Sequence, residues 1–163
     1  MSAALGATWG VVGVALLLLD AIARVGRVAY ATVDAGLDGE HVASLVAICG
    51  AMAWAEGYRG FQRGLSPRIV RRAVELARAP RAWHVVAAPL YCLELVAAPR
   101  ATLVRAWSLL AMIVGFVVIV AHLPAPWRGL VDAGVVVGLA WGLASLAVFS
   151  LRAAAGIDRA GRL

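Results

Sequence analysis

The sequence predicts an all-α membrane protein with four transmembrane helices, an amphipathic helix in the membrane plane, and a short re-entrant or inner-leaflet hairpin. Three observations favour this class. Hydrophobic residues make up 63% of the chain, against about 45–50% in soluble domains. They occur in long uncharged runs, and all fifteen basic residues are arginines that flank these runs. Bilayer topology and anionic headgroups account for arginines in such places, so nucleic-acid binding is a poor explanation of the net charge of +6.

The first span is predicted over about residues 4–28. The run from Ala3 to Leu19 carries no charge, but a helix needs about 20 apolar residues to cross the bilayer, so the helix continues past Asp20. Arg24 follows four residues later, and the two side chains can pair on one face near the end of the span. The next loop is acidic and is expected on the side without positive charge.

The second span is predicted over about residues 41–61. The basic segment that follows contains Ser66-Pro67, residue types typical of a helix start. Apolar and charged side chains then fall on opposite faces, which predicts an amphipathic helix at 66–79 lying in the membrane plane. The arginines of this helix predicted to contact lipid headgroups are Arg68, Arg71, Arg72 and Arg78.

The run at 83–98 is short for a span. Its sixteen residues reach only about 24 Å as a helix, less than the roughly 30 Å hydrocarbon core, and Pro89 interrupts it. If this segment turns back, twelve arginines lie inside and three outside; if it crosses, the split becomes eight to seven and the positive-inside signal is lost. We therefore predict a re-entrant or inner-leaflet hairpin in a multi-pass membrane protein with both termini cytoplasmic.

Two further spans are predicted over about residues 106–123 and 129–151. The last one carries Gly134, Gly138 and Gly142 at four-residue steps. Such a stripe lets another backbone approach closely, which is how membrane helices associate. Its expected partner is the first or third span of the same chain, and a homodimer face is the alternative.

Ionisable residues at membrane depth are candidates for function. The clearest group is Glu56, Tyr58 and Arg59 on the second span, which Tyr91 and Glu94 of the hairpin can join at the inner leaflet. Two carboxylates would then face each other across a polar pocket lined by tyrosines. The structural alternative is that Glu56 pairs with Arg59, while Glu94 reaches an arginine of the amphipathic helix and fixes the hairpin to the bundle.

No cofactor or metal is predicted. His41 and His122 are weak candidates for a divalent cation or a haem iron, because they are placed at the outer ends of neighbouring spans but far apart in sequence. Cys49 and Cys92 lie in apolar runs without metal-site spacing, which is typical of buried small residues. The sequence has no phosphate loop, nucleophile elbow or zinc-protease motif, which makes an enzyme the less favoured class.

Three stretches of the chain after His41 form a recognisable set. They are Glu56-Gly-Tyr-Arg-Gly-Phe-Gln62 with Ser66-Pro67-Arg68, Ala88-Pro-Leu-Tyr-Cys92, and Pro126-Trp-Arg-Gly-Leu-Val-Asp132 with its continuation to Gly142. Through them, most of the chain after His41 resembles a group of small bacterial inner-membrane proteins. The resemblance implies a bacterial inner-membrane location and supplies neither a substrate nor a catalytic residue.

Three functions stay open. The favoured one is a non-enzymatic accessory or assembly subunit of a membrane complex, because the chain has packing glycines, short outer loops and no catalytic set. The second is a small oligomeric transporter or channel in which Glu56, Tyr91 and Glu94 line a path beside the helix broken at Pro89. The third is a membrane enzyme or cofactor carrier acting on a lipid or quinone. The expected partners are anionic lipid headgroups, other membrane subunits or a second copy of the chain.

Overall fold

A computed structural model describes residues 3–79 and 82–160, and within these ranges the chain is helical without strands. Three helices of this part are long and apolar enough to cross a membrane: Leu5–Asp34, Arg100–Ala121 and Trp127–Gly156. The prediction of an all-α, multi-pass membrane protein is confirmed to this extent. The helices are α1 (Ala3–Asp34), α2 (Gly39–Met52), the π-helix η1 (Ala53–Leu65), α3 (Ser66–Arg78), α4 (Ala82–Val86), α5 (Ala88–Cys92), α6 (Arg100–Ala121) and α7 (Trp127–Ala160).

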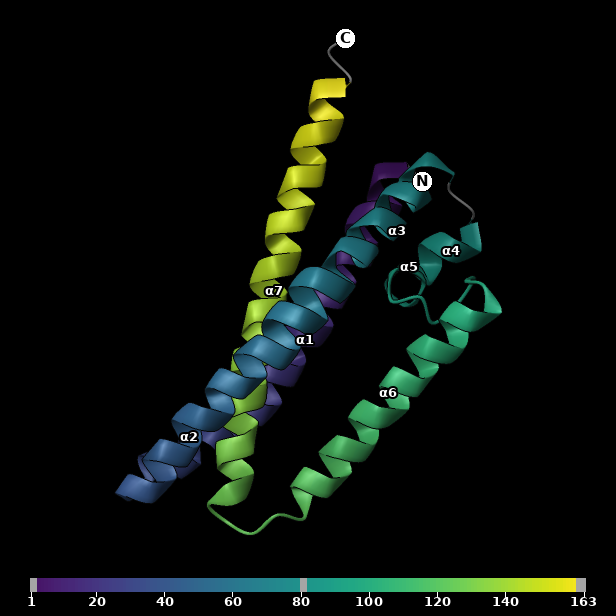
Figure 1. The fold of residues 1–163 in the computed structure, drawn as a ribbon. Coiled ribbons are helices and arrows are strands. Elements are labelled where there is room, and N and C mark those ends of the chain that lie inside the picture. The colour runs from purple at the N-terminus through teal and green to yellow at the C-terminus, as the bar shows by residue number, and fades with distance from the viewer. Residues whose placement is uncertain (1–2, 80–81, 161–163) are drawn as a thin grey trace.

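Helices α1 and α7 pack antiparallel in the centre of the fold (Figure 1). Gly26 of α1 lies against Val136 of α7, and Gly129 at the start of α7 lies against Thr32 near the end of α1. Residue numbers therefore rise along one helix as they fall along the other. The beginning of α1 and the last turns of α7 consequently lie at the same end of the bundle.

Helices α2, η1 and α3 form one continuous helix from Gly39 to Arg78, visible as an unbroken ribbon in Figure 1. Leu65 and Ser66 both have right-handed helical backbone angles, and the Ser66 N–H donates to the carbonyl of Phe61. Helix α3 begins at Ser66, where the sequence predicts it, but it continues η1 and has no side-chain cap. Pro67 lacks the N–H of an ordinary helical residue, and the chain nevertheless goes on as α3 to Arg78.

The amphipathic pattern of α3 is present, but its apolar face packs on protein. Ile69, Val70, Ala73 and Leu76 are each at most 9% exposed and share a core with residues of α1, α5 and α7. An amphipathic helix in the membrane plane needs this face for lipid. The packing therefore does not fit the predicted in-plane placement, and α3 instead extends the bundle.

Helices α4 and α5 occupy the predicted hairpin region at 83–98 and lie against the first half of α1. Each has five residues. Gly6, Gly10 and Gly13 of α1 leave the room they need, and a Cβ on Gly10 would lie 2.7 Å from the Sγ of Cys92. The sequence reasoning missed this second set of small residues, although its spacing of four and three residues places all three on one helix face.

The glycine stripe of α7 packs inside the chain, against α2 and η1. Its partner is the second predicted span rather than the first or third, so this face is covered without a second copy. The helices approach so closely here that a Cβ added at any of the three glycines would lie under 3.0 Å from a neighbouring atom, a distance that real Cβ atoms almost never show. A Cβ would lie 2.7 Å from Ile48 at Gly134, 2.6 Å from the Glu56 carboxylate at Gly138, and 2.6 Å from the Phe61 ring at Gly142.

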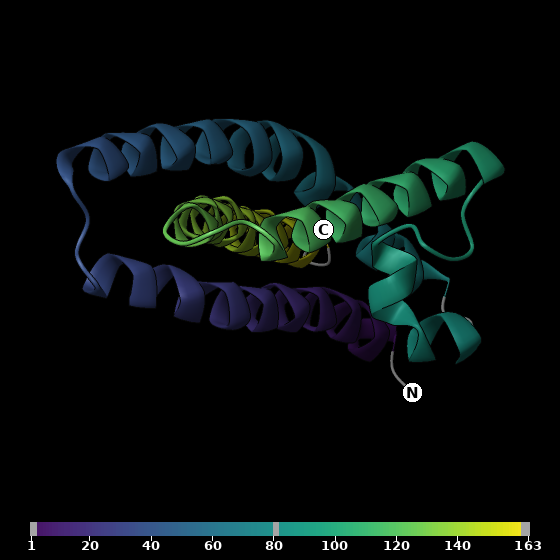
Figure 2. The same cartoon turned by 90° about the horizontal axis from the view of Figure 1, so that it is seen from below.

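Helix α6 stands apart from the other long helices. Only 6% of its candidate span is buried, against 22% for α1 and 28% for α7. It approaches α7 near its own C-terminal end, where Val120 is buried. Figure 1 and Figure 2 show α6 close to α7 near the loop that joins them and farther from α7 toward its other end, which lies beside α5. Over most of its length, α6 therefore presents its side chains to the surroundings of the chain rather than to another helix.

Candidate functional site

The residues of the predicted polar pocket lie in two separate groups. Glu94 is buried and accepts a hydrogen bond from Arg68 Nη1 at 3.2 Å, whereas the Glu56 side chain lies against Gly138 of α7. The two carboxylates thus contact different helices, Glu94 through Arg68 of α3 and Glu56 through Gly138 of α7. The geometry of Glu94 fits the structural alternative, in which it fixes the segment after α5 to α3.

The stretch from Glu56 to Gln62 lies in η1, a π-helix of 13 residues. Such helices are rare and occur often at functional sites. Here the wide turn packs closely on α7, since a Cβ on Gly57 would lie 2.7 Å from the Trp141 ring. Trp141 Nε1 also donates to Gln62 Oε1 at 2.8 Å. The contact of η1 with α7 therefore extends from Gly57 to Gln62.

Tyr58 and Arg59 lie on the exposed side of η1. Arg59 lies over the Trp54 ring, 5.0 Å from its centre, and Arg63 lies over the Tyr58 ring at 5.6 Å. The predicted pair between Glu56 and Arg59 is absent from the ion pairs of the described residues. The wider turn of a π-helix explains this, because residues three apart no longer share a face as they do in an α-helix.

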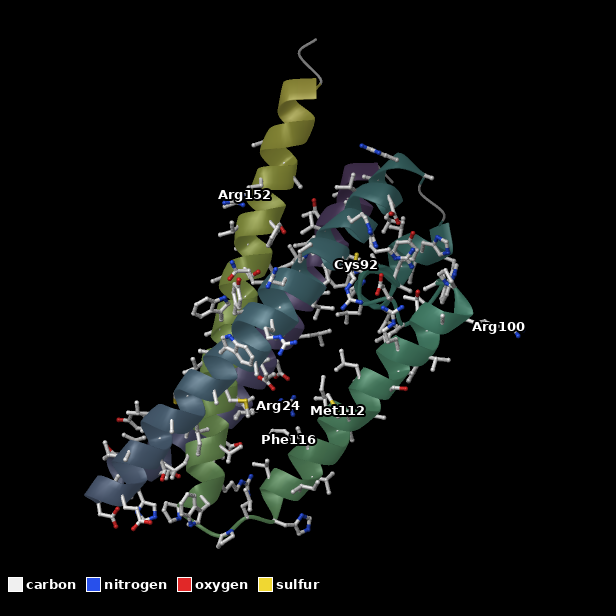
Figure 3. The ribbon with its side chains drawn as sticks, in the orientation of Figure 1. Arg24, Cys92, Arg100, Met112, Phe116 and Arg152 are labelled. Carbon is white, nitrogen blue, oxygen red and sulfur yellow. The ribbon has the colours of Figure 1, made fainter. Side chains whose placement is uncertain are left out.

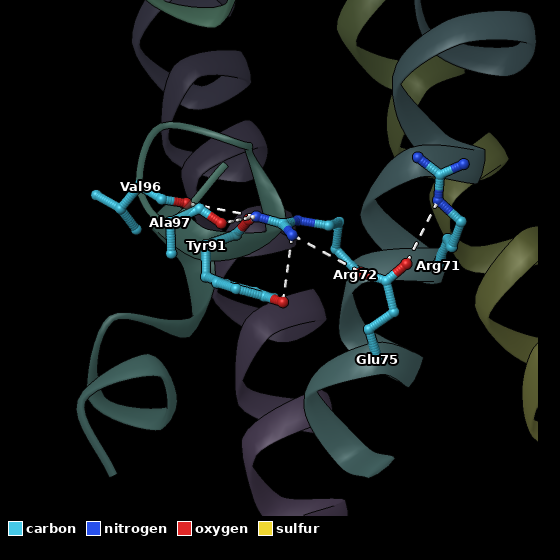
Figure 4. Close-up of polar contacts among 6 residues, drawn as sticks. All are labelled: Arg71, Arg72, Glu75, Tyr91, Val96 and Ala97. Atoms are coloured by element: carbon cyan, nitrogen blue, oxygen red, sulfur yellow. Dashed lines mark hydrogen bonds and ion pairs between the residues drawn. The ribbon is translucent and has the colours of Figure 1, made fainter. Parts of the chain in front are cut away.

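Arg72 is the centre of a clamp between α3 and the segment after α5 (Figure 4). Its guanidinium lies 3.9 Å from the centre of the Tyr91 ring. It donates to the Tyr91 hydroxyl at 3.2 Å and to the carbonyls of Val96 and Ala97 at 3.4 and 3.0 Å. Glu94 and Ala97 have positive φ angles of 61° and 52°, which are costly in residues other than glycine. The clamp holds this strained segment in place, and we call it the α3–α5 clamp.

The four arginines predicted to contact headgroups therefore divide between two faces of α3. Arg68 and Arg72 point to the α5 side and are engaged there. Arg71 points the opposite way, toward α7, as Figure 4 shows, and its side chain is 66% exposed against 12% for Arg72. Arg78 is exposed as well. Two of the four arginines, Arg71 and Arg78, keep the exposure that a headgroup contact needs.

His41 and His122 have separate structural surroundings. Asp38 caps α2 by accepting a hydrogen bond from the His41 N–H at 2.9 Å, and its Oδ1 lies 2.6 Å from His41 Nδ1. The His41 ring packs edge-on against Trp127. His122 Nδ1 lies 2.7 Å from the Val118 carbonyl at the end of α6. Among the residues at 3–79 and 82–160, no three His, Cys, Asp or Glu side chains gather as metal ligands.

The ion pair of Asp20 and Arg24 that the sequence predicts forms on an exposed face of α1. Arg24 Nε donates to Asp20 Oδ2 at 2.7 Å, and the side chains are 71% and 58% exposed. The pair is predicted near the end of a span, but α1 continues to Asp34, because no glycine or proline interrupts the helix between Arg27 and Asp34. We call Asp20 and Arg24 the mid-depth pair, because they lie near the middle of the α1 candidate span.

The contacts between α1 and α7 give the depth of this pair. Gly26 lies against Val136 and Thr32 against Gly129. Both helices rise about 1.5 Å per residue, so the same antiparallel register places Asp20 and Arg24 opposite about residues 138–142 of α7. These residues form the middle of the α7 candidate span.

The position of α6 agrees with this depth. In Figure 3, Arg24 lies at about the height of Met112 and Phe116; Met112 is in the middle of α6, and Phe116 is about one turn closer to its C-terminal end. The mid-depth pair thus lies near the centre of two candidate spans. Glu56 lies at the same level, because it contacts Gly138.

No protein-family model, curated protein or solved structure matches the chain.

The chemistry of the mid-depth pair limits what can surround it. Charged side chains at the centre of a membrane are costly in hydrocarbon, and they almost always face protein or water. Pairing with each other lowers this cost, and a polar surface or water next to α1 would lower it further for a pair that is more than half exposed in the single chain.

Proposed function

We propose that this protein is a non-enzymatic subunit of the bacterial inner membrane that docks on another integral membrane protein through the exposed sides of α1 and α6. The mid-depth pair carries the proposal. Lipid tails cannot solvate Asp20 and Arg24, whereas polar groups on a partner helix can. The small buried fraction of α6 supports the same proposal, because a second long helix also lacks a packing partner over most of its length.

The proposed topology has four spans, with both termini cytoplasmic. Helix α2 and η1 run beside α7 from Gly134 to Gly142. They would therefore cross the membrane next to α7 and add a span to the three candidate spans, as the second in chain order. Helices α4 and α5 have five residues each, about 8 Å as a helix, too short to cross. The arginine-rich α3 belongs to the same end of the bundle, which the positive-inside rule assigns to the cytoplasm. The resemblance to small bacterial inner-membrane proteins supports the location.

A small oligomeric transporter is the second candidate, and one observation favours it. Glu56 is partly buried at the level of the mid-depth pair, and the described residues offer it no ion partner. If several copies enclosed water, these three side chains could line its path. Tyr91 and Glu94 would not belong to that path, because the α3–α5 clamp and Arg68 hold them. Neither a lipid enzyme nor a quinone carrier gains support from the geometry.

Photo-crosslinking in native membranes tests the docking proposal. A photoreactive amino acid at Ala23 or Met112, both exposed, probes the surroundings of α1 and α6. Val46, which is 68% exposed on α2, is the matched control. We expect adducts with one other membrane protein from the first two positions and only lipid adducts from the third. In an Arg24→Leu background the adducts from Ala23 should disappear.

The alternatives give different adducts. Protein adducts made solely with second copies of the chain would overturn the accessory role and favour the oligomeric transporter. Lipid adducts alone at Ala23 and Met112 would overturn docking through these helices.

A further inference from the structure

A hollow of about 630 Å³ opens between α3 and the last part of α7. Its lining combines apolar and basic side chains from both helices. The apolar ones include Val70, Val74 and Phe149, and the basic ones are Arg71, Arg78 and Arg152. Ligand sites commonly have volumes of about 300–1,000 Å³ and place a few polar groups around an apolar lining. This hollow has both properties.

The charge of the hollow is positive. Glu75 is its one acidic lining residue, and this carboxylate is shared between Arg71 at 3.8 Å and Arg72 of the α3–α5 clamp at 3.7 Å. Arg78 and Arg152 form no ion pair within the described residues. The lining thus contains three arginines and one carboxylate, which leaves guanidinium donors available for an anion.

The hollow lies at the depth of lipid headgroups. After Asp132, helix α7 carries no charge until Arg152. The uncharged stretch 133–151 is about 28 Å long as a helix, close to the roughly 30 Å of a hydrocarbon core. Arg152 therefore stands where the hydrocarbon ends, and the apolar side chains of the hollow continue toward the acyl region.

We propose that this hollow binds one anionic phospholipid. Arg71, Arg78 and Arg152 hold the phosphate, because guanidinium forks match its oxygens, and an acyl chain lies on Phe149 and the valines of α3. Basic pockets between membrane helices on the cytoplasmic side bind anionic headgroups in this way. A zwitterionic lipid would bring its own cation among the arginines. The site does not depend on what covers the mid-depth pair.

Native mass spectrometry of the purified full-length protein tests the lipid class. The probe is dioleoyl-phosphatidylglycerol. Dioleoyl-phosphatidylcholine has the same chains with a neutral headgroup, and glycerol phosphate has the phosphate without the chains. We expect one bound phosphatidylglycerol, binding about tenfold weaker for phosphatidylcholine, and no retained glycerol phosphate. Equal retention of the two lipids would overturn the proposal, and glycerol phosphate binding as well as phosphatidylglycerol would show a site for free phosphate instead.

Single charge changes test the position of the site. Arg152→Gln removes one charge from the hollow, and Arg105→Gln removes the same charge from an exposed arginine of α6 outside it. We expect the dissociation constant for phosphatidylglycerol to rise about fivefold in the first variant and to change less than about twofold in the second. Equal weakening in both would show diffuse attraction and overturn the site. If Arg152→Gln unfolds at a lower temperature, Arg78→Gln on α3 makes the same comparison.

Discussion

The Arg72 guanidinium lies 3.9 Å from the centre of the Tyr91 ring and donates to the hydroxyl of the same residue. This contact joins the end of a long continuous helix to a segment that is too short to cross the membrane. It also places the guanidinium beside the carbonyls of a segment with two positive φ angles. Arg72 thus contributes to the order of the region at 83–98, together with the Arg68–Glu94 pair and the packing of α5 on α1.

Replacing Arg72 with lysine tests this contribution. Lysine keeps the charge but has no planar fork, so it cannot contact the Tyr91 ring and two carbonyls at once. We expect Arg72→Lys to lower the free energy of unfolding by about 2 kcal/mol, measured by circular dichroism during detergent denaturation. Arg71→Lys is the matched control and should change it by less than about 0.5 kcal/mol. Equal losses in the two variants would argue against the clamp.

The glycine stripe gives a second prediction. A Cβ at position 142 would lie 2.6 Å from the ring of Phe61, and an aromatic ring moves less easily than the end of a flexible side chain. We expect Gly142→Ala to destabilise the protein by about 1–3 kcal/mol in the same denaturation measurement. Gly115 of α6 has no neighbour within 4 Å of its Cβ position, so Gly115→Ala should be neutral or stabilising. A neutral Gly142→Ala would contradict the close packing of α7 on η1.

The sequence predicts the helical membrane class and the close helix packing at the glycines of 134–142, because both follow from local patterns. It does not predict the continuous helix through Ser66, since serine followed by proline is a common helix start and only tertiary packing makes the helix continue. The pocket of Glu56 and Glu94 fails for a related reason. Both residues are at one end of a span in the one-dimensional pattern, but which face each occupies depends on the π-helix and on Arg68.

The depth of Asp20 shows the same limit. Hydropathy places it near a span end because the uncharged run stops there, whereas its true level depends on the register between α1 and α7. Register is set by contacts such as Gly26 with Val136, and these are not visible in one helix alone.

The burial of Cys92 gives a third prediction. Its thiol is fully buried, and this burial raises the pKa to about 11, against the opposing charge of Arg72. Because the thiolate is the reactive form, a Cys49→Ser variant should react with maleimide at pH 7.5 only after unfolding. Gly10→Leu would put a side chain where the sulfur lies, and we expect it to speed labelling by more than about tenfold through opening of α5.

The control for this measurement is Gly50→Leu, because no atom lies within 4 Å of the Cβ position of Gly50. Labelling should stay slow in that variant. Rapid labelling of the parent Cys49→Ser protein would show that α5 does not cover Cys92 in the membrane.

The cap of α2 gives a prediction about pH. The His41 N–H that Asp38 accepts is the largest cause that lowers the pKa of this carboxyl below its ordinary value of 3.8. A carboxyl with a lower pKa in the folded state stabilises that state above its unfolded pKa and loses this effect as the pH falls. The difference in unfolding temperature between the wild type and Asp38→Ala should therefore be full at pH 6–7 and shrink below about pH 4. Asp34→Ala, in the same acidic segment, should show a smaller difference in unfolding temperature at pH 6–7.

A second control repeats the comparison of Asp38 with Asp38→Ala in a His41→Gln background, which removes the imidazole contact. If the difference in unfolding temperature between wild type and Asp38→Ala stayed constant down to pH 3, the charge of Asp38 would have no part in the cap.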